Sequence, residues 1–399
     1  MFDGLDMAPP DAIMGLNEAF KKDPRPEKIN LTIGVYKDEN GDTPVFHTVK
    51  LAEERLLKQE KSKGYLAIEG SPEQAAAVQE LLFGGDHPYI RKKVCATAQT
   101  PGGTGGLRVA ADLIRQIHHG ATVWISEPTW PNHPGIFNAA GLNIKHYPYY
   151  DAETKTLDFE SMMDALKQVN PGDLVLLHGA CHNPTGLDPD AEQWAALAKL
   201  ATQLRFVPFF DFAYQGLGDG IEEDAAGLRA FCTEGREMVI ASSFSKNFGL
   251  YNERVGALTL VAKSAEAAQA ALSHLKSTIR ANYSTPPAHG GLIVSAILGD
   301  PALKAEWVKE VAAMRERIHK MRQLFVDTLK KKKAKKDFGF LILQKGMFSF
   351  SGLTKEQVQR LREDHAVYVV GNGRINVAAM TGANMDPLCT AIAAVLKAG

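Results

Sequence analysis

The stretch SSFSKNFGLYNERVG, residues 242–256, decides how this sequence is interpreted, because it surrounds one lysine with polar groups. Lys246 lies between two seryl hydroxyls, and Arg254 follows eight residues later. The apolar run MVIA just before the stretch predicts a buried strand. Lys246 would then lie just beyond a strand end, where α/β proteins place their chemistry. Taken alone, the stretch fits a solvent-exposed lysine in a loop equally well.

Short apolar runs alternate with helical patterns on both sides of this stretch. The clearest runs are VCATAQT (94–100), ATVWISEP (121–128), LVLLHGA (174–180) and FVPFFDFAY (206–214). This alternation predicts an α/β fold with a mostly parallel sheet covered by helices on both faces.

The pattern changes after about residue 301. One long helical segment is followed by three strand-like runs, FLILQ (340–344), MFSFSGL (347–353) and RINVAAM (374–380), and by a closing helix. We expect a smaller α/β domain here, over 314–399, with the first 44 residues packed against it. A large domain would then cover 45–313.

Composition excludes several classes of protein. The 399 residues include 45 basic and 46 acidic side chains, so the net charge of -1 does not favour a nucleic-acid partner. No run approaches the roughly 20 apolar residues of a membrane span. The four cysteines, Cys95, Cys181, Cys232 and Cys389, are far apart, which favours a reducing compartment over a disulfide framework or a zinc site. We therefore expect a cytoplasmic protein without a metal.

Three further stretches contain groups suited to binding a ligand. TPGGTGGLRVAAD (100–112) is a glycine-rich turn that opens a helix, and such a turn favours a phosphate. Asp211 lies within an apolar strand, where a carboxylate needs a cation or several donors. HGACHNPTG (178–186) ends another strand and contains Asn183. A purely structural turn, a helix-capping aspartate and a plain loop are the respective alternatives.

One ligand satisfies all these stretches together. It would offer a phosphate, a cationic ring nitrogen, a ring oxygen and a carbonyl group. Gly103, Thr104, Ser243, Ser245 and Arg254 would bind the phosphate, and Asp211 would pair with the ring nitrogen. Asn183 and Tyr214 would bind the ring oxygen, and Lys246 would react with the carbonyl group. Pyridoxal 5′-phosphate (PLP) has all four groups, and it binds to a lysine with an acidic partner for its pyridinium nitrogen.

The sequence resembles the aspartate aminotransferase family, in its bacterial and animal branch, over nearly the whole chain. The motifs are NLTIGVYKDENGDTPV, GYLAIEG, TAQTPGGTGGLRVAAD, HNPTGLDP, FDFAYQG, SSFSKNFGLYNERVGA, IRANYSTPPAHGG and MFSFSGLTKEQV. The resemblance implies the large PLP-dependent aminotransferase fold (fold type I), with a mainly parallel seven-stranded sheet and a small domain made from both chain ends. It also implies a homodimer that shares its active sites and acts on amino acids and 2-oxo acids.

The resemblance also implies a role for each matched residue. Lys246 would bind the cofactor covalently and carry the proton, Asp211 would pair with the ring nitrogen with His133 behind it, and Trp130 would stack on the ring. Asn183 and Tyr214 would bind the ring oxygen. Tyr65 of the other subunit would reach the phosphate. Arg374, with Gly34 and Asn183, would bind the substrate α-carboxylate, and Arg280 of the other subunit would bind the side-chain carboxylate.

Arg280 favours a dicarboxylate substrate, so we expect L-aspartate and 2-oxoglutarate to be converted to oxaloacetate and L-glutamate. Val35, Lys37, Thr43 and Thr104 resemble the aspartate branch, whereas Thr285, Gly64 and Phe244 depart from it. These departures leave a broad-specificity aromatic aminotransferase as the alternative. A nucleotide-dependent oxidoreductase and a protein of this fold that only binds a partner are alternatives of other classes.

Overall fold

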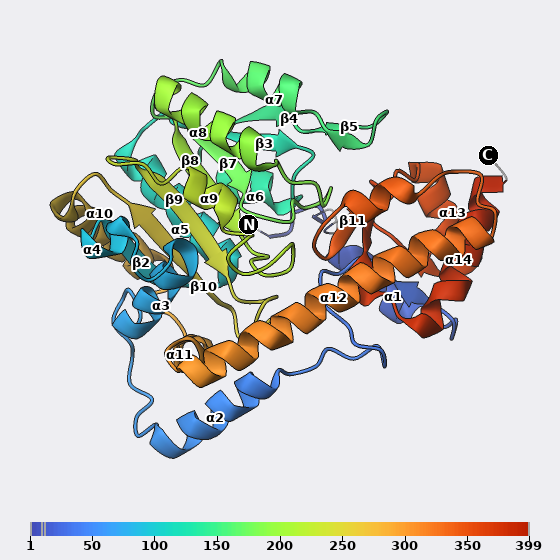
Figure 1. The fold of residues 1–399 in the computed structure, drawn as a ribbon, viewed down its shortest axis with the longest axis horizontal. Coiled ribbons are helices and arrows are strands. Elements are labelled where there is room, and N and C mark those ends of the chain that lie inside the picture. Colours follow the sequence, from blue (N-terminus) through green and yellow to red (C-terminus); the bar gives the residue numbers. More distant parts are fainter. Residues whose placement is uncertain (1, 9–10, 12, 398–399) are drawn as a thin grey trace. The chain divides into compact units, whose positions relative to one another are not determined.

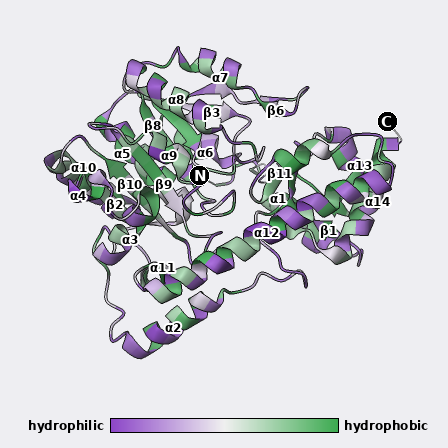
Figure 2. Ribbon diagram, in the orientation of Figure 1, coloured by the Kyte–Doolittle hydropathy of each residue, from purple (hydrophilic) through white to green (hydrophobic). Residues whose placement is uncertain are grey.

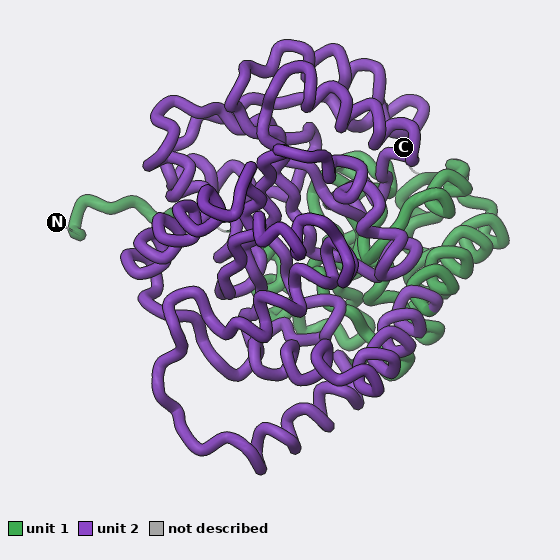
Figure 3. The backbone as a smooth tube through the Cα atoms, turned by 60° about the vertical axis from the view of Figure 1, so that its left-hand side comes forward, with its two compact units in different colours: residues 1–42, 317–399 green, residues 43–316 purple. Residues whose placement is uncertain are grey.

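The computed structural model describes residues 2–8, 11 and 13–397, and the chain divides into two compact units (Figure 3). Unit 1 comprises residues 1–42 and 317–399, and unit 2 comprises residues 43–316. The boundaries predicted from the sequence, after residues 44 and 313, differ from these by two and three residues.

Unit 2 is built around a seven-stranded sheet in the order β2-β10-β9-β8-β7-β3-β4 (Figure 1). The strands are β2 (Cys95–Pro101), β3 (Thr122–Glu127), β4 (Asn143–Pro148), β7 (Leu174–His178), β8 (Val207–Phe212), β9 (Met238–Ser243) and β10 (Val255–Val261). All the strands of this sheet except β10 run in the same direction. The predicted mainly parallel α/β sheet is thus confirmed.

Helices cover both faces of this sheet, as the alternation of side chains along β2 shows. Ala96 and Ala98 pack in the core that includes α5 (Gly102–Ile117), whereas Thr97 accepts a hydrogen bond from Gln79 of α3 (Pro72–Phe83). Successive strand residues point to opposite faces, so α5 and α3 lie on opposite sides. The other elements of unit 2 are α2 (His47–Gln59), α4 (Pro88–Arg91), α6 (Asn132–Ala139), β5 (Tyr150–Asp151), β6 (Thr156–Leu157), α7 (Phe159–Leu166), α8 (Ala191–Leu204), α9 (Ala226–Ala230), α10 (Ala265–Asn282) and α11 (Ala288–Leu298).

The middle strands are continuous apolar runs, because a parallel sheet buries both faces. Every residue of β9 and β10 is buried, and β8 and β10 are among the most hydrophobic segments in Figure 2. Helix α8 begins where a capping box places it: the Asp190 carboxylate accepts from the Gln193 N–H, and the Gln193 side chain accepts from the Asp190 N–H, both at 2.9 Å.

Unit 1 joins both ends of the chain. Strand β1 (Ile29–Asn30) pairs in parallel with β12 (Val367–Tyr368), and β11 (Phe348–Phe350) pairs antiparallel with β13 (Arg374–Asn376). The remaining elements are α1 (Met14–Lys22), the end of α12 (Pro301–Lys331), a 3-10 helix at Gly339–Leu343, α13 (Lys355–His365), a 3-10 helix at Val377–Ala379 and α14 (Gly382–Lys397).

The prediction of a strand at FLILQ was wrong, because this run lies in the first 3-10 helix of unit 1. Leu341 is fully buried, whereas Ile342 and Leu343 are 46% and 70% exposed. A short apolar run does not by itself distinguish a strand from a helical turn. None of the helices in the described part of the chain is long and apolar enough to cross a membrane.

Candidate active site

The register of the large sheet brings Asp211, Ser243 and the start of the glycine-rich turn to one edge of the sheet. His178 at the end of β7 lies opposite Asp211 on β8, and Ser243 at the end of β9 lies opposite Gly256 on β10. Gly256 also pairs with Thr100 on β2, so the glycine-rich turn begins at the same edge. This is the carboxyl edge of the parallel strands, where ligands of α/β proteins bind.

Asp211 has its partner on another element, as its apolar strand requires. Its Oδ2 lies 3.0 Å from Nε2 of His133 on α6, and His133 is fully buried. Burial acts to raise the pKa of Asp211, but the hydrogen bond from His133 and the nearby charge of Lys246 outweigh burial and hold the pKa below its usual value. The carboxylate is therefore ionised and able to pair with a buried cation.

A chain of hydrogen bonds runs on from His133 and has a fixed direction. The backbone N–H of Asn183 donates to Nδ1 of His178 at 3.3 Å, so neutral His178 has its proton on Nε2 and donates to Thr129 Oγ1 at 3.2 Å. The Thr129 hydroxyl then donates to Nδ1 of His133 at 2.8 Å, which leaves the Nε2 proton of His133 for Asp211. The donor Thr129 at Nδ1 and the acceptor Asp211 at Nε2 thus imply the same tautomer of His133, with its proton on Nε2.

Sequence reasoning missed His178 and Thr129. His178 ends the apolar run LVLLH, as Asp211 lies in FVPFFDF, and that parallel was the available signal. Burial lowers the pKa of His178 to about 3, with a further contribution from His133 and an opposing one from Asp211. His178 is therefore neutral, as the direction of the chain requires.

The glycine-rich turn and the segment after β9 form one cradle. A Cβ on Gly102 would lie 2.6 Å from a guanidinium nitrogen of Arg254, and one on Gly103 would lie 3.1 Å from Cβ of Ser243. The hydroxyl of Ser245 accepts from Nη1 of Arg254 at 3.3 Å. Backbone N–H groups at the start of α5, two hydroxyls and an exposed guanidinium thus surround one place, which suits a phosphate.

Lys246 lies between this cradle and the ring-binding residues. Its Nζ is 4.8 Å from the centroid of the Tyr214 ring, and its charge is among those that lower the pKa of Asp211. Tyr214 and Asn183 are 7% and 4% exposed, and the Trp130 ring lies edge-on to His133 at 5.2 Å. Thr104 is half-buried in the first turn of α5.

Two predicted residues of unit 2 stand apart from this group because their side chains point to solvent. Tyr65 is 95% exposed. Arg280, near the end of α10, is exposed and donates to the hydroxyl of Ser284, and the described part of the chain gives it no ion pair. In the described part of the single chain, neither side chain forms a hydrogen bond or ion pair with the other predicted site residues.

Unit 1 contains Arg374 and Gly34. Arg374 lies on β13, is 2% exposed, and donates from Nη2 to the carbonyl of Thr32 at 2.6 Å. Its guanidinium carbon lies 4.2 Å from the centroid of the Phe348 ring. A Cβ on Gly34 would lie 2.6 Å from the same ring, so a glycine is needed there. The guanidinium is thus fixed by packing next to the segment of Gly34.

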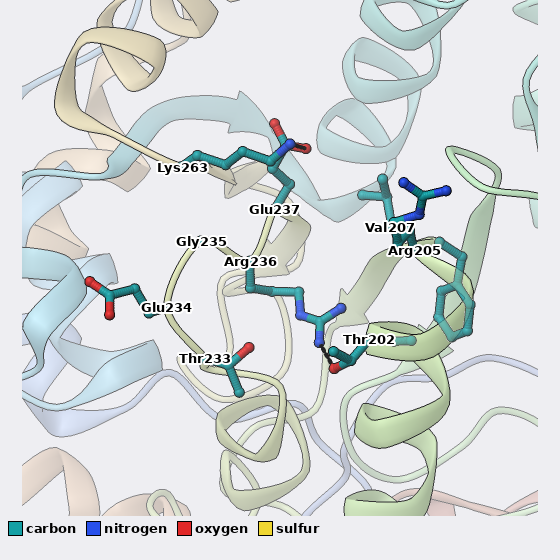
Figure 4. Close-up of a pocket in the computed structure, with 11 residues that line it drawn as sticks. Thr202, Arg205, Val207, Thr233, Glu234, Gly235, Arg236, Glu237 and Lys263 are labelled. Atoms are coloured by element: carbon teal, nitrogen blue, oxygen red, sulfur yellow. Dashed lines mark hydrogen bonds and ion pairs between the residues drawn. The ribbon is translucent and has the colours of Figure 1, made fainter.

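A separate cavity of about 290 Å³ in unit 2 contains none of the predicted residues. It lies where α8 ends and β8 begins, beside residues 233–237 (Figure 4). Lys263 pairs with Glu237 at 3.3 Å, and Arg236 donates to Thr202 and to a carbonyl of α8. The cavity is therefore separate from the candidate active site.

Comparison with known proteins shows the family of this chain. A family model described as aminotransferase class I and II matches residues 26–392. The chain belongs to this family. It is 58% identical over 396 residues to the aspartate aminotransferase of Salmonella typhi, which covers 99% of the chain and 100% of that protein. It is 46% identical over 387 residues to the aromatic-amino-acid aminotransferase of Pseudomonas aeruginosa, covering 97% of each.

The fold agrees with solved structures of the family. The crystal structure of an aromatic-amino-acid aminotransferase from Burkholderia pseudomallei, covalently bound to pyridoxal phosphate, matches with a TM-score of 0.96. The two chains are 47% identical, and the match covers 99% of each. The predicted family and fold class are therefore confirmed, while the roles of individual residues stay predictions.

Proposed function

We propose that this chain is a PLP-dependent aminotransferase that converts L-aspartate and 2-oxoglutarate to oxaloacetate and L-glutamate. The observation that carries the proposal is the buried carboxylate of Asp211, bonded to His133 at 3.0 Å on the strand edge where Lys246 follows β9. A buried carboxylate facing a lysine and a phosphate cradle suits one ligand that has a cationic ring, a carbonyl group and a phosphate.

The residues of unit 2 fit PLP. The cradle of Gly103, Thr104, Ser243, Ser245 and Arg254 offers donors to the phosphate, and the Arg254 guanidinium lies 2.6 Å from where a Cβ on Gly102 would be. Asp211 offers its charge to the ring nitrogen, Asn183 and Tyr214 offer donors to the ring oxygen, and Trp130 offers a ring for stacking. When bound, PLP supplies an electron sink for the carbanion formed at the substrate Cα.

The side chains of the protein would handle the protons and the substrate charges. The Lys246 amine would take the proton from Cα and return it to C4′ of the cofactor. The ionised Asp211 would keep the ring nitrogen protonated. Arg374, with Gly34 and Asn183, would bind the α-carboxylate, because a planar guanidinium forms two parallel bonds with a carboxylate.

Aspartate as the main substrate is supported by the higher identity to an aspartate aminotransferase, 58%, than to an aromatic one, 46%. Arg280 would pair with the side-chain carboxylate. Lys37, one of the residues that resemble the aspartate branch, donates to the carbonyl of Gly41 at 2.5 Å. The second candidate is broad specificity that includes tyrosine and phenylalanine, which Thr285, Gly64 and Phe244 leave open as departures from the aspartate branch.

We further propose a cytoplasmic homodimer in which each active site uses Tyr65 and Arg280 of the other subunit. Both side chains are exposed in the single chain, and so are Phe2, Leu5 and Met7 near the N-terminus, at 75%, 70% and 95%. Apolar side chains exposed in such a group are typical of surfaces that bind another protein. The four separated cysteines suit a reducing compartment.

A substrate panel tests the proposal. The purified enzyme with PLP is assayed with aspartate, phenylalanine and tyrosine, each with 2-oxoglutarate as acceptor, and with glutamate and oxaloacetate for the reverse direction. We expect kcat/KM for aspartate to exceed the aromatic values by at least about tenfold, because a dicarboxylate uses both arginines. Higher values for tyrosine or phenylalanine would establish the second candidate, and no transamination of any substrate would reject the function.

A further inference from the structure

A second histidine of the turn after β7 lies outside the hydrogen-bond chain that ends at Asp211. His182 is 1% exposed, and each of its ring nitrogens lies next to a hydroxyl: Nε2 is 2.9 Å from Ser126 Oγ, and Nδ1 is 2.8 Å from Thr185 Oγ1. A neutral imidazole has one donor and one acceptor, and a hydroxyl can serve as either, so both nitrogens are satisfied.

The faces of the His182 ring are also covered. The Tyr149 ring stacks on the His182 ring, with the two ring centroids 3.8 Å apart and the ring planes 12° apart. The ring centroid of His178 lies 4.1 Å from that of His182. Burial lowers the pKa of His182 well below its usual value, and any positive charge on the neighbouring His178 or His133 would lower it further. His182 is therefore a neutral, fixed bridge.

This bridge joins two segments that each contain predicted active-site residues. Ser126 lies on β3, just before Thr129 and Trp130. Thr185 lies two residues after Asn183, in the turn whose Asn183 N–H determines the tautomer of His178. The imidazole thus ties the turn to the end of β3.

The start of the turn is held separately. The Asp188 carboxylate accepts from the N–H groups of Cys181 and His182 at 2.7 and 2.9 Å. Those bonds fix the backbone at its beginning. The His182 ring links the turn to β3 through Ser126, beside the bonds that Leu187 accepts from Tyr149 and that join Asn183 to Thr129 through His178. The side chain of His182 therefore contributes to the position of Asn183 relative to Thr129.

We propose that His182 is a positioning residue for the cofactor: its two ring hydrogen bonds hold the Asn183 turn against the end of β3 and so keep the His178–Thr129–His133–Asp211 chain aligned. This inference rests on the proposed PLP function. Without the two bonds, Asn183 would move away from the ring oxygen of PLP, and His178 would lose the N–H donor that orients it. PLP would then bind less tightly, and the protonation of its ring nitrogen would change.

The test compares His182→Phe, Ser126→Ala and Thr185→Val with Tyr149→Phe. Phenylalanine keeps a stacked ring but has neither hydrogen bond, and the other two variants each remove one hydroxyl. Tyr149→Phe is the matched control, because it removes a buried bond of the same turn, from the Tyr149 hydroxyl to the Leu187 carbonyl at 2.8 Å, and leaves the imidazole untouched. The measurements are PLP affinity of the apoenzyme, the pH midpoint of the bound-PLP absorbance change, and the thermal midpoint of the apoenzyme.

We expect Ser126→Ala and Thr185→Val each to bind PLP about tenfold more weakly, as for one lost buried hydrogen bond, and His182→Phe, which loses both, to bind it more weakly still. All three should shift the pH midpoint. Tyr149→Phe should lower the thermal midpoint without either change. Should the bridge variants match Tyr149→Phe in affinity and pH midpoint, His182 is a packing residue only. If His182→Phe does not fold, the two hydroxyl variants decide. Wild type that fails to bind PLP would reject the proposed function instead.

Discussion

Nε2 of His133 and Oδ2 of Asp211 lie 3.0 Å apart although the two residues are 78 positions apart in the chain. One lies on a helix and the other on a strand, and the bond leaves the carboxylate ionised in an apolar setting. A buried charge of this kind is costly unless it is paired, so its presence indicates a cationic partner in the working protein.

The first prediction concerns the lysine. Borohydride reduction of the PLP-loaded protein should attach the cofactor to Lys246, and peptide mass spectrometry will locate it. Lys246→Ala should lose transamination by far more than the ~10²–10⁴ of a missing general base, because covalent attachment is lost too. A reduced adduct on any other lysine contradicts the assignment. Lys263→Ala, at an exposed lysine of the separate cavity, is the control and should behave as wild type.

Asp211→Asn should leave the fold largely intact and slow proton removal from Cα. The amide keeps the shape of the carboxylate, but it has no charge with which to hold the ring nitrogen protonated. Single-turnover exchange of the Cα proton of aspartate, followed in deuterated water, measures the step directly. A wild-type exchange rate in this variant would show that Asp211 has no part in it.

The cradle predicts opposite results for two helical glycines. Gly103→Ala places a Cβ 3.1 Å from Cβ of Ser243, so PLP affinity should fall by about tenfold or more as the cradle shifts. Gly135→Ala on α6 meets only the Asn132 side chain at 3.4 Å, so it should keep PLP affinity and gain up to about 1 kcal/mol of stability from helix propensity. PLP titration and urea unfolding distinguish the two, and equal PLP affinities would contradict the cradle.

The pKa of His178, lowered to about 3, gives a pH dependence with a definite sign. Between pH 3 and about 6.5 the unfolded chain takes up a proton on this imidazole and the folded chain does not, so the free energy of unfolding falls as the pH falls. The slope is about 1.4 kcal/mol per pH unit for one histidine. Urea unfolding of the apoenzyme from pH 5 to 7 should show a smaller slope in His178→Asn than in wild type. Replacing the exposed His146 by asparagine is the control, and a slope unchanged in His178→Asn contradicts the prediction.

Hybrid dimers test the proposed sharing of sites. Subunits with Lys246→Ala and subunits with Arg280→Ala are mixed, unfolded and refolded, and hybrids are counted by native mass spectrometry. In a hybrid dimer, one active site contains both substitutions. The other site takes its Lys246 from the Arg280→Ala subunit and its Arg280 from the Lys246→Ala subunit, so both residues are intact there. Hybrids should therefore recover about half of the wild-type aspartate activity per dimer if the sites are independent. Hybrids without activity would mean that Arg280 acts in its own subunit or not on substrate.

The sequence by itself determined the alternation of strands and helices, the lysine beyond a strand end, and the buried aspartate in need of a partner. These follow from local patterns: apolar runs of strand length, glycines before a helix, and one charged residue among apolar ones. It did not determine the 3-10 helix at Gly339–Leu343. Leu341 is buried there while Ile342 and Leu343 are exposed, and this difference depends on tertiary packing.

Only the tertiary structure decided which polar groups meet. The register of β7 against β8 sets His178 beside Asp211, and the turn after β7 directs the Asn183 N–H at Nδ1 of His178. Histidine tautomers depend on neighbours that are distant in sequence, so no local pattern contains them. Hydrogen bonds between strands and turns therefore determine the donor-to-acceptor direction of the series of hydrogen bonds that ends at Asp211.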